Sequence, residues 1–119
     1  MTLNNLKDLY KKHKESLLFG RYINAKHIKP LLDKHAGFFQ IECIGQSVLN
    51  DDIYSVTFGN GPKKILMWSQ MHGNESTTTK AIFDVLNTIN SNNEFSKQLL
   101  KDCTITIIPM LNPDGAKAY

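Results

Sequence analysis

Residues 65–75 join an apolar run to a polar loop, and they read ILMWSQMHGNE. The short, nearly continuous apolar run over residues 64–69 is typical of a strand that is covered on both faces inside a sheet. A second run of this kind, TITII, occupies residues 104–108. We therefore expect both segments to be interior strands.

The segment between these two runs has the periodicity of an amphipathic helix. Its apolar residues recur at steps of three and four and predict a helix over residues 76–90: Ala81, Ile82, Val85, Leu86 and Ile89. A strand, a helix and a second strand of these lengths form a crossover unit that joins parallel strands.

Upstream, the apolar period changes to two. Phe39, Ile41 and Cys43 alternate with polar residues, and residues 54–58 do the same after a turn at residues 50–52. This pattern predicts an antiparallel hairpin. Together the segments predict an α/β fold, with a mixed sheet of about four strands and flanking helices.

The N-terminal third has helical rather than strand periodicity. It predicts one amphipathic helix over residues 2–18 and a second from Asn24 to about residue 35, kinked or delayed by Pro30. We therefore divide the chain into an N-terminal helical segment, residues 1–37, and an α/β domain, residues 38–119.

Charge and hydropathy narrow the range of partners. Residues 1–35 hold eight Lys or Arg against three Asp or Glu, while residues 36–119 hold six against eight. We interpret the basic stretch as a solvated helix face, because acidic residues are interspersed and no nucleic-acid motif accompanies it. Neither a bilayer-spanning run nor a secretion signal is present, so we expect a cytoplasmic protein without nucleic-acid or membrane partners.

The two cysteines give little information on function. Cys43 and Cys103 lie in predicted strands without Cys-x-x-Cys spacing, and we expect both to be small buried side chains.

The chemistry concentrates in the loop that follows the first apolar strand. His72 and Glu75 lie after the carboxyl end of this strand and before a helix, where open α/β sheets collect ligands. Imidazole and carboxylate are both Zn²⁺ donors, and Gly73 permits a tight bend between them. A catalytic zinc needs three protein ligands, so a third donor must come from elsewhere.

A second polar cluster follows the second apolar strand at the same predicted end of the sheet. It comprises Asn112, Pro113, Asp114 and Gly115, and its composition predicts an ordinary β-turn.

Taken in this order and spacing, the segments 65–75 and 109–115 resemble the carboxypeptidase A-like zinc carboxypeptidase family, and residues 44–47 and 53–56 look like its opening hairpin. The resemblance covers residues 38–119 and implies the first half of that fold. It implies hydrolysis of an amide bond by a metal-activated water, with His72 and Glu75 as zinc ligands.

The resemblance also implies that the third zinc ligand, the general base and the substrate-binding arginines lie downstream. His13, His27 and His35 precede the motif and do not match the third ligand. We therefore expect this 119-residue chain to be a truncated, inactive part of a metallocarboxypeptidase.

Two alternatives to a peptidase remain. His72-Gly73-Asn74-Glu75 also occurs in zinc amidohydrolases of the aspartoacylase and succinylglutamate desuccinylase type, which act on N-acyl amino acids, although the cluster at residues 112–115 favours a peptidase. The other alternative is a non-catalytic interaction module that binds a partner through the basic N-terminal helix.

A sheet that stops at residues 104–108 would leave that strand or its neighbour with an unpaired edge or an uncovered apolar face. Exposed edges pair readily, so we expect self-association or an exchange of elements between copies.

Overall fold

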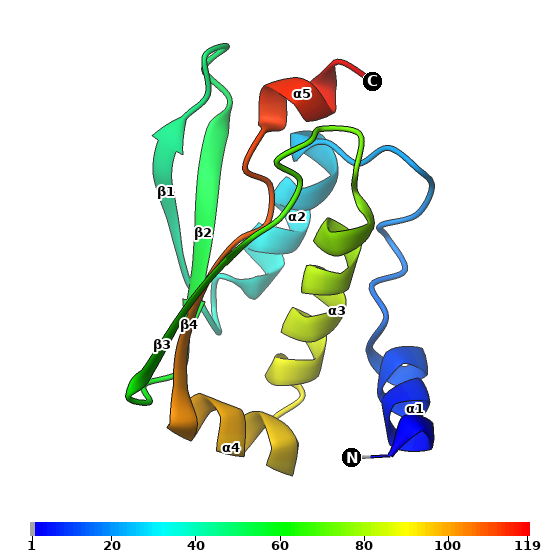
Figure 1. Ribbon diagram of the computed structural model, residues 1–119, viewed down its shortest axis with the longest axis vertical. Coiled ribbons are helices and arrows are strands. Elements are labelled where there is room, and N and C mark those ends of the chain that lie inside the picture. The colour runs from blue at the N-terminus through cyan, green and yellow to red at the C-terminus, as the bar shows by residue number, and fades with distance from the viewer. Residues whose placement is uncertain (1) are drawn as a thin grey trace.

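The computed structural model describes residues 2–119, in which a mixed sheet lies beside helices (Figure 1). The elements in chain order are α1 (Leu3–His13), α2 (Ala25–His35), β1 (Gln40–Gln46), β2 (Asp52–Phe58), β3 (Lys63–Trp68), α3 (Thr77–Asn90), α4 (Glu94–Asp102), β4 (Cys103–Ile108) and α5 (Pro113–Lys117).

The sheet has the strand order β1-β2-β4-β3. The predicted hairpin is confirmed, since β1 and β2 pair antiparallel. The predicted crossover is also confirmed, because β3 and β4 pair in parallel from Lys63↔Cys103 to Trp68↔Ile108. An antiparallel pairing of β2 with β4 joins the two units and makes the sheet mixed, as the α/β prediction requires.

One hydrophobic core lies between the sheet and the helices α2 and α3, which lie on the same side of it (Figure 1). Alternate residues of β2 and β4 face this core, and Val56 and Ile107 are fully buried there. Leu32 from α2 and Phe83 from α3 meet them. The core thus draws on residues from both sides of the predicted boundary at residue 37, and that boundary stays a prediction.

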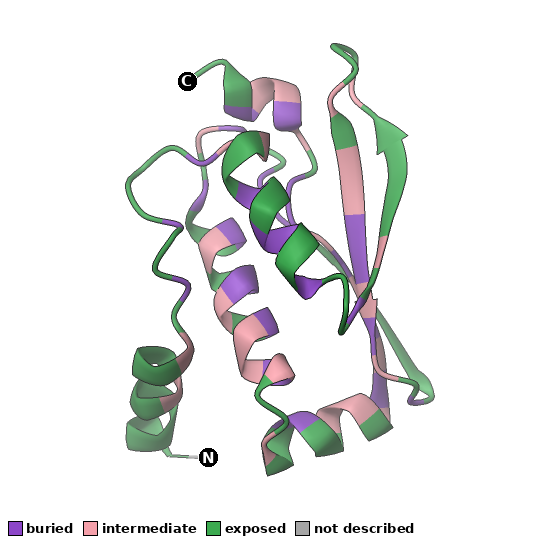
Figure 2. Cartoon of the chain, turned by 180° about the vertical axis from the view of Figure 1, so that it is seen from behind, coloured by how far each residue is buried: buried purple, intermediate pink, exposed green. Residues whose placement is uncertain are grey.

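The prediction that residues 64–69 are covered on both faces is wrong for β3. All six residues of this strand are exposed, because β3 lies at one edge of the sheet and only β4 pairs with it among the described residues (Figure 2). Leu66 and Trp68 expose 61% and 52% of their surface. Strand β3 therefore has the apolar composition of a buried strand but is exposed to solvent in this structure.

The first helix is shorter than residues 2–18. It ends at His13 because tertiary contacts take over the next residues: the Glu15 amide donates to Asp84 Oδ1 at 2.6 Å, and Asn87 donates to Glu15 Oε2 at 3.1 Å. The second helix confirms its predicted cap, since Asn24 Oδ1 accepts from the Lys26 amide. No helix within the described part of the chain is both long and apolar enough to cross a membrane.

Three local expectations also differ. The cluster at residues 112–115 is not a β-turn but the first turn of α5, whose Pro113 fits the start of a helix because its missing amide hydrogen is not needed there. Helix α4, capped by Asn93, was not predicted. Cys103 is buried as expected, whereas Cys43 is exposed because it lies on the edge strand β1.

His35 is a buried imidazole between two aromatic rings. Its ring centroid lies 5.4 Å from that of Phe39 and 6.5 Å from that of Phe83, and neither ring nitrogen finds a hydrogen-bond partner among the described residues. Burial, and next the positive charge of Lys34, lower the pKa of His35. The physical reason is that the charged imidazolium would lose its hydration in the core.

We expect the free energy of unfolding to fall as the pH is lowered from about 7.5 to about 5.5. The unfolded chain takes up the His35 proton more readily than the folded one, so the stability present above an unfolded pKa of about 6.5 is lost as the pH falls through that value. Urea denaturation at several pH values measures this slope. A His35→Leu variant should flatten it and a His13→Gln control should keep it; a full slope in His35→Leu would contradict the assignment.

Candidate metal centre

The candidate site is the loop over residues 69–76, which leads from the carboxyl end of β3 to the start of α3. The segment that follows β4 runs beside it. The Leu111 amide donates to Ser69 O at 2.9 Å, and the Asn112 amide donates to Gln70 O at 3.2 Å. The parallel pairing of β3 and β4 thus continues past the strands and places both polar clusters at one end of the sheet (Figure 1).

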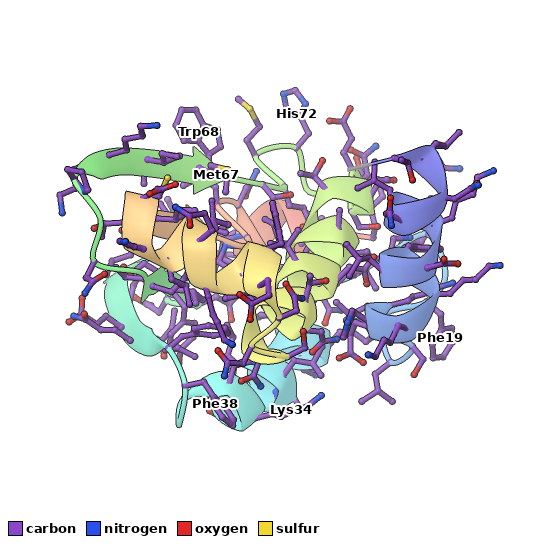
Figure 3. The ribbon with its side chains drawn as sticks, turned by 90° about the horizontal axis from the view of Figure 1, so that it is seen from below. Phe19, Lys34, Phe38, Met67, Trp68 and His72 are labelled. Carbon is purple, nitrogen blue, oxygen red and sulfur yellow. The ribbon has the colours of Figure 1, made fainter. Side chains whose placement is uncertain are left out.

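His72 and Glu75 face one another across this loop. His72 Nδ1 lies 3.1 Å from Glu75 Oε2, and the Glu75 amide donates to His72 O at 3.0 Å, which closes a tight turn. Their side chains are 65% and 70% exposed, so the pair is open to solvent. Figure 3 shows His72 projecting from the same side of the molecule as Trp68.

The separation of these two donor atoms fits a shared zinc ion. Two donors about 2.1 Å from one ion at a tetrahedral angle lie roughly 3.4 Å apart, close to the 3.1 Å between His72 Nδ1 and Glu75 Oε2. Imidazole nitrogen with carboxylate oxygen is also a donor set that zinc accepts. Within residues 2–119, no group of three His, Cys, Asp or Glu side chains is placed to hold a metal. The pair on its own is therefore short of the three protein ligands that a catalytic zinc needs.

A close backbone contact presses the loop against the start of α5. A Cβ atom added to Gly73 would lie 1.9 Å from the carbonyl carbon of Gly115 and 2.2 Å from the amide nitrogen of Ala116. Real Cβ atoms do not approach backbone this closely, so residue 73 must lack a side chain for the loop to reach α5. The glycine between the two donors is thus required by packing as well as by the bend.

Asn112 connects the two loops through its side chain. Its Nδ2 donates to Met71 O at 3.1 Å, and its Oδ1 accepts from the Gly115 amide at 2.8 Å. One residue therefore caps α5 and holds the backbone that immediately precedes His72.

Asp114 joins α5 to the turn of the β1–β2 hairpin, which lies at the opposite edge of the sheet from β3. Ser47 Oγ donates to Asp114 Oδ1 at 2.5 Å, and the Leu49 amide donates to Asp114 Oδ2 at 3.1 Å. The β1–β2 turn, α5 and the candidate metal loop form one connected unit.

Beneath the loop lies a buried polar pair. Gln70 Nε2 donates to Gly73 O at 2.8 Å, and Gln70 Oε1 accepts from Thr79 Oγ1 at 2.7 Å. The Thr79 hydroxyl is also 3.0 Å from Pro109 O and 3.1 Å from Ser69 Oγ. Both side chains are almost completely buried, and their polar atoms are satisfied, as buried polar groups must be.

The structure brings together the two site residues that the sequence suggested, and their role as metal ligands stays a prediction. Sequence reasoning missed Gln70, Thr79 and the bridging role of Asn112. The signal that could have indicated the role of Asn112 is the position of the cluster 112–115 directly after β4, the strand parallel to β3. No pattern in the sequence marks Gln70 as buried, and one of its partners, Ile23 O, belongs to a segment far away in the chain.

Comparison with known proteins shows which family the chain resembles. Residues 25–119 match the family described as zinc carboxypeptidase. Gamma-D-glutamyl-L-diamino acid endopeptidase 1 of Lysinibacillus sphaericus is 35% identical over 86 residues, which is 66% of this chain and 22% of that protein. The chain thus spans about a fifth of the length of this relative.

Solved structures agree on the fold. A metallo-carboxypeptidase from Burkholderia cenocepacia superposes with a TM-score of 0.72 at 17% identity, over 80% of this chain and 28% of that one. A metallo-carboxypeptidase from Pseudomonas aeruginosa, solved with (2-guanidinoethylmercapto)succinic acid, gives 0.64 at 22% identity, over 80% of this chain and 27% of that one. At these identities the likeness concerns the fold alone.

Proposed function

The chain belongs to the zinc carboxypeptidase family, and from that premise we propose that it supplies two zinc ligands, His72 and Glu75, to a metallopeptidase that hydrolyses amide bonds. The observation that carries the proposal is the 3.1 Å separation of His72 Nδ1 and Glu75 Oε2 in a solvent-open loop. Asn112 and Gly73 fix the loop that carries both.

A zinc ion held there would supply the Lewis acidity needed to polarise a substrate carbonyl and activate water. The part played by this chain is to hold the side chains of His72 and Glu75 in place. The turn closed by the Glu75 amide and His72 O holds His72 Nδ1 and Glu75 Oε2 3.1 Å apart and leaves both side chains exposed to solvent. The open surface leaves room for a substrate to approach.

We further propose that the remaining zinc donor lies outside residues 2–119, since the described residues offer only two converging donors. A two-ligand site lacks both a closed coordination set and a base, and such groups act as a unit in hydrolysis. The 119-residue chain by itself is accordingly expected to be inactive.

The proposed substrate class is a peptide, including cell-wall-type peptides. The relative from Lysinibacillus sphaericus is named for an endopeptidase activity on gamma-D-glutamyl-L-diamino acid bonds, and this supports such a substrate. The alternative is an N-acyl amino acid, because residues 72–75 also fit zinc amidohydrolases. The resemblance of the cluster 112–115 to the zinc carboxypeptidase family favours the peptidase. A cytoplasmic location stays a prediction.

Zinc titration of the chain, followed by NMR of the imidazole resonances, tests the ligand assignment. We expect Zn²⁺ to shift the His72 resonances and to leave those of His13, His27 and His35 in place, because within residues 2–119 His72 is the histidine that pairs with a carboxylate. Glu75→Gln keeps the size of the side chain but weakens its donor oxygen, so it should lower the zinc affinity several-fold. Equal shifts at all four histidines would remove the basis of the proposal.

Hydrolysis assays separate the substrate classes and test the expected inactivity. The zinc-loaded 119-residue chain should release no product from dipeptides with free or blocked C-termini, from gamma-D-glutamyl-diamino acid peptides, or from N-acyl amino acids. The product of the complete reading frame should cleave the peptides in preference to the N-acyl amino acids. Robust turnover by the 119-residue chain would contradict the expected inactivity. A preference of the longer protein for N-acyl amino acids would contradict the proposed peptide substrate.

We also propose that the open edge of β3 pairs with β3 of a second copy. An antiparallel pairing centred on Leu66 places Leu66 against its own counterpart and Lys64 against Trp68 on the same face of the joined sheet. The ammonium group and the indole ring then form a favourable cation–π pair. Such pairing would cover apolar side chains that β3 now exposes (Figure 3).

Light scattering over a range of concentrations tests this pairing. The wild-type chain should show a concentration-dependent dimer, and Leu66→Lys should be monomeric because two ammonium groups would meet at the centre of the contact. Val48→Lys is the matched control, since Val48 is 93% exposed in the turn between β1 and β2 and should leave the dimer intact. A monomeric wild-type chain at high concentration would refute the proposal.

A further inference from the structure

Three backbone carbonyls in the segment before α2 accept hydrogen bonds from residues in and after the metal loop. We call residues 20–23 the N-terminal strap. Lys80 Nζ donates to Gly20 O at 2.7 Å, Ser76 Oγ donates to Arg21 O, and Gln70 Nε2 donates to Ile23 O at 2.6 Å. The strap lies just before residues 25–119, which carry the family match.

Side-chain packing holds the strap in place. Ile23 is 1% exposed and belongs to the hydrophobic core. Tyr22 stacks on Tyr119, with ring centroids 5.6 Å apart and ring planes 6° from parallel. These two contacts hold the strap against the rest of the chain.

Two side chains of the loop, Gln70 and Ser76, bond to the strap, and Gln70 also bonds to the backbone of the loop at Gly73. Its two amide hydrogens go to Ile23 O and Gly73 O, and its carbonyl oxygen accepts from Thr79. The residue also has a φ of 49°, which is uncommon for a residue with a side chain and needs support from its surroundings. Without this amide, three buried polar groups would lose a partner.

The metal ligands have no comparable support of their own. His72 and Glu75 are exposed and contact each other, so their relative position follows from the path of the backbone between them. Gly73 lies in that path, and its carbonyl is held by Gln70. The orientation of both donor atoms consequently depends on the buried amide beneath them.

We propose that Gln70 is a positioning residue that couples the N-terminal strap to the zinc loop and sets the separation of the His72 and Glu75 donor atoms. This inference rests on the proposed function for the role of zinc, but the coupling itself concerns the metal-free chain as well. Outer partners of this kind typically change metal affinity by about 10- to 100-fold when removed.

The experiment compares Gln70→Met, which keeps the length of the side chain but removes its polar atoms, with Lys80→Met. Lys80→Met removes a strap contact that does not involve the loop, so it is the matched control. Zinc affinity is read from the His72 resonances, stability from thermal unfolding, and loop order from hydrogen exchange of the Glu75 amide without zinc. That amide donates to His72 O at 3.0 Å.

We expect Gln70→Met to weaken zinc binding by about tenfold or more and to speed exchange of the Glu75 amide, while Lys80→Met changes zinc affinity by less than about twofold. Thr79→Val removes the donor to Gln70 Oε1 together with the contacts of the hydroxyl to Pro109 O and Ser69 Oγ; it should give an intermediate loss and serves if Gln70→Met does not fold. Unchanged affinity and exchange in both loop variants would overturn the inference. If the wild-type chain binds no zinc, the proposed function fails, and the exchange rates alone decide the coupling.

Discussion

The parallel pairing of β3 with β4 is the constraint on which the rest of the structure depends. It carries two chain segments that are distant in sequence to the same end of the sheet, and the hydrogen bonds continue past the strands into both loops. Once the loops lie side by side, Gly73 and Gly115 can touch through their backbones. The contacts of Gly73 and Asn112 between the two loops follow from this juxtaposition.

The site is built from the inside outwards. Buried amide and hydroxyl groups of Gln70 and Thr79 fix the floor of the loop, Asn112 holds its side, and the two proposed ligands project from its top. This arrangement has a physical reason: the exposed side chains of His72 and Glu75 pack against little else, so the backbone of the loop sets the positions of their donor atoms. A metal ligand can be recognised in a sequence far more easily than the residues that aim it.

Strand β3 shows how composition and environment can disagree. Its apolar run has the character of an interior strand, yet it occupies an edge of the sheet, and the charged start at Lys63 and Lys64 is the only polar protection along it. Edge strands usually carry charges, bulges or proline along their length, because an open apolar edge pairs readily. The open edge of β3 is therefore a surface on which the pairing of another strand would be favourable.

The sequence by itself determined the hairpin, the parallel crossover and the pair His72 and Glu75, because these are fixed by local periodicity and by the short loop that joins a strand to a helix. It did not determine that β3 is exposed, that α1 ends at His13, or that Gln70 reaches back to Ile23. Those features arise from contacts between segments far apart in the chain. Hydrogen bonds from a side chain to a remote backbone carbonyl leave no periodic trace, so only the tertiary structure could decide them.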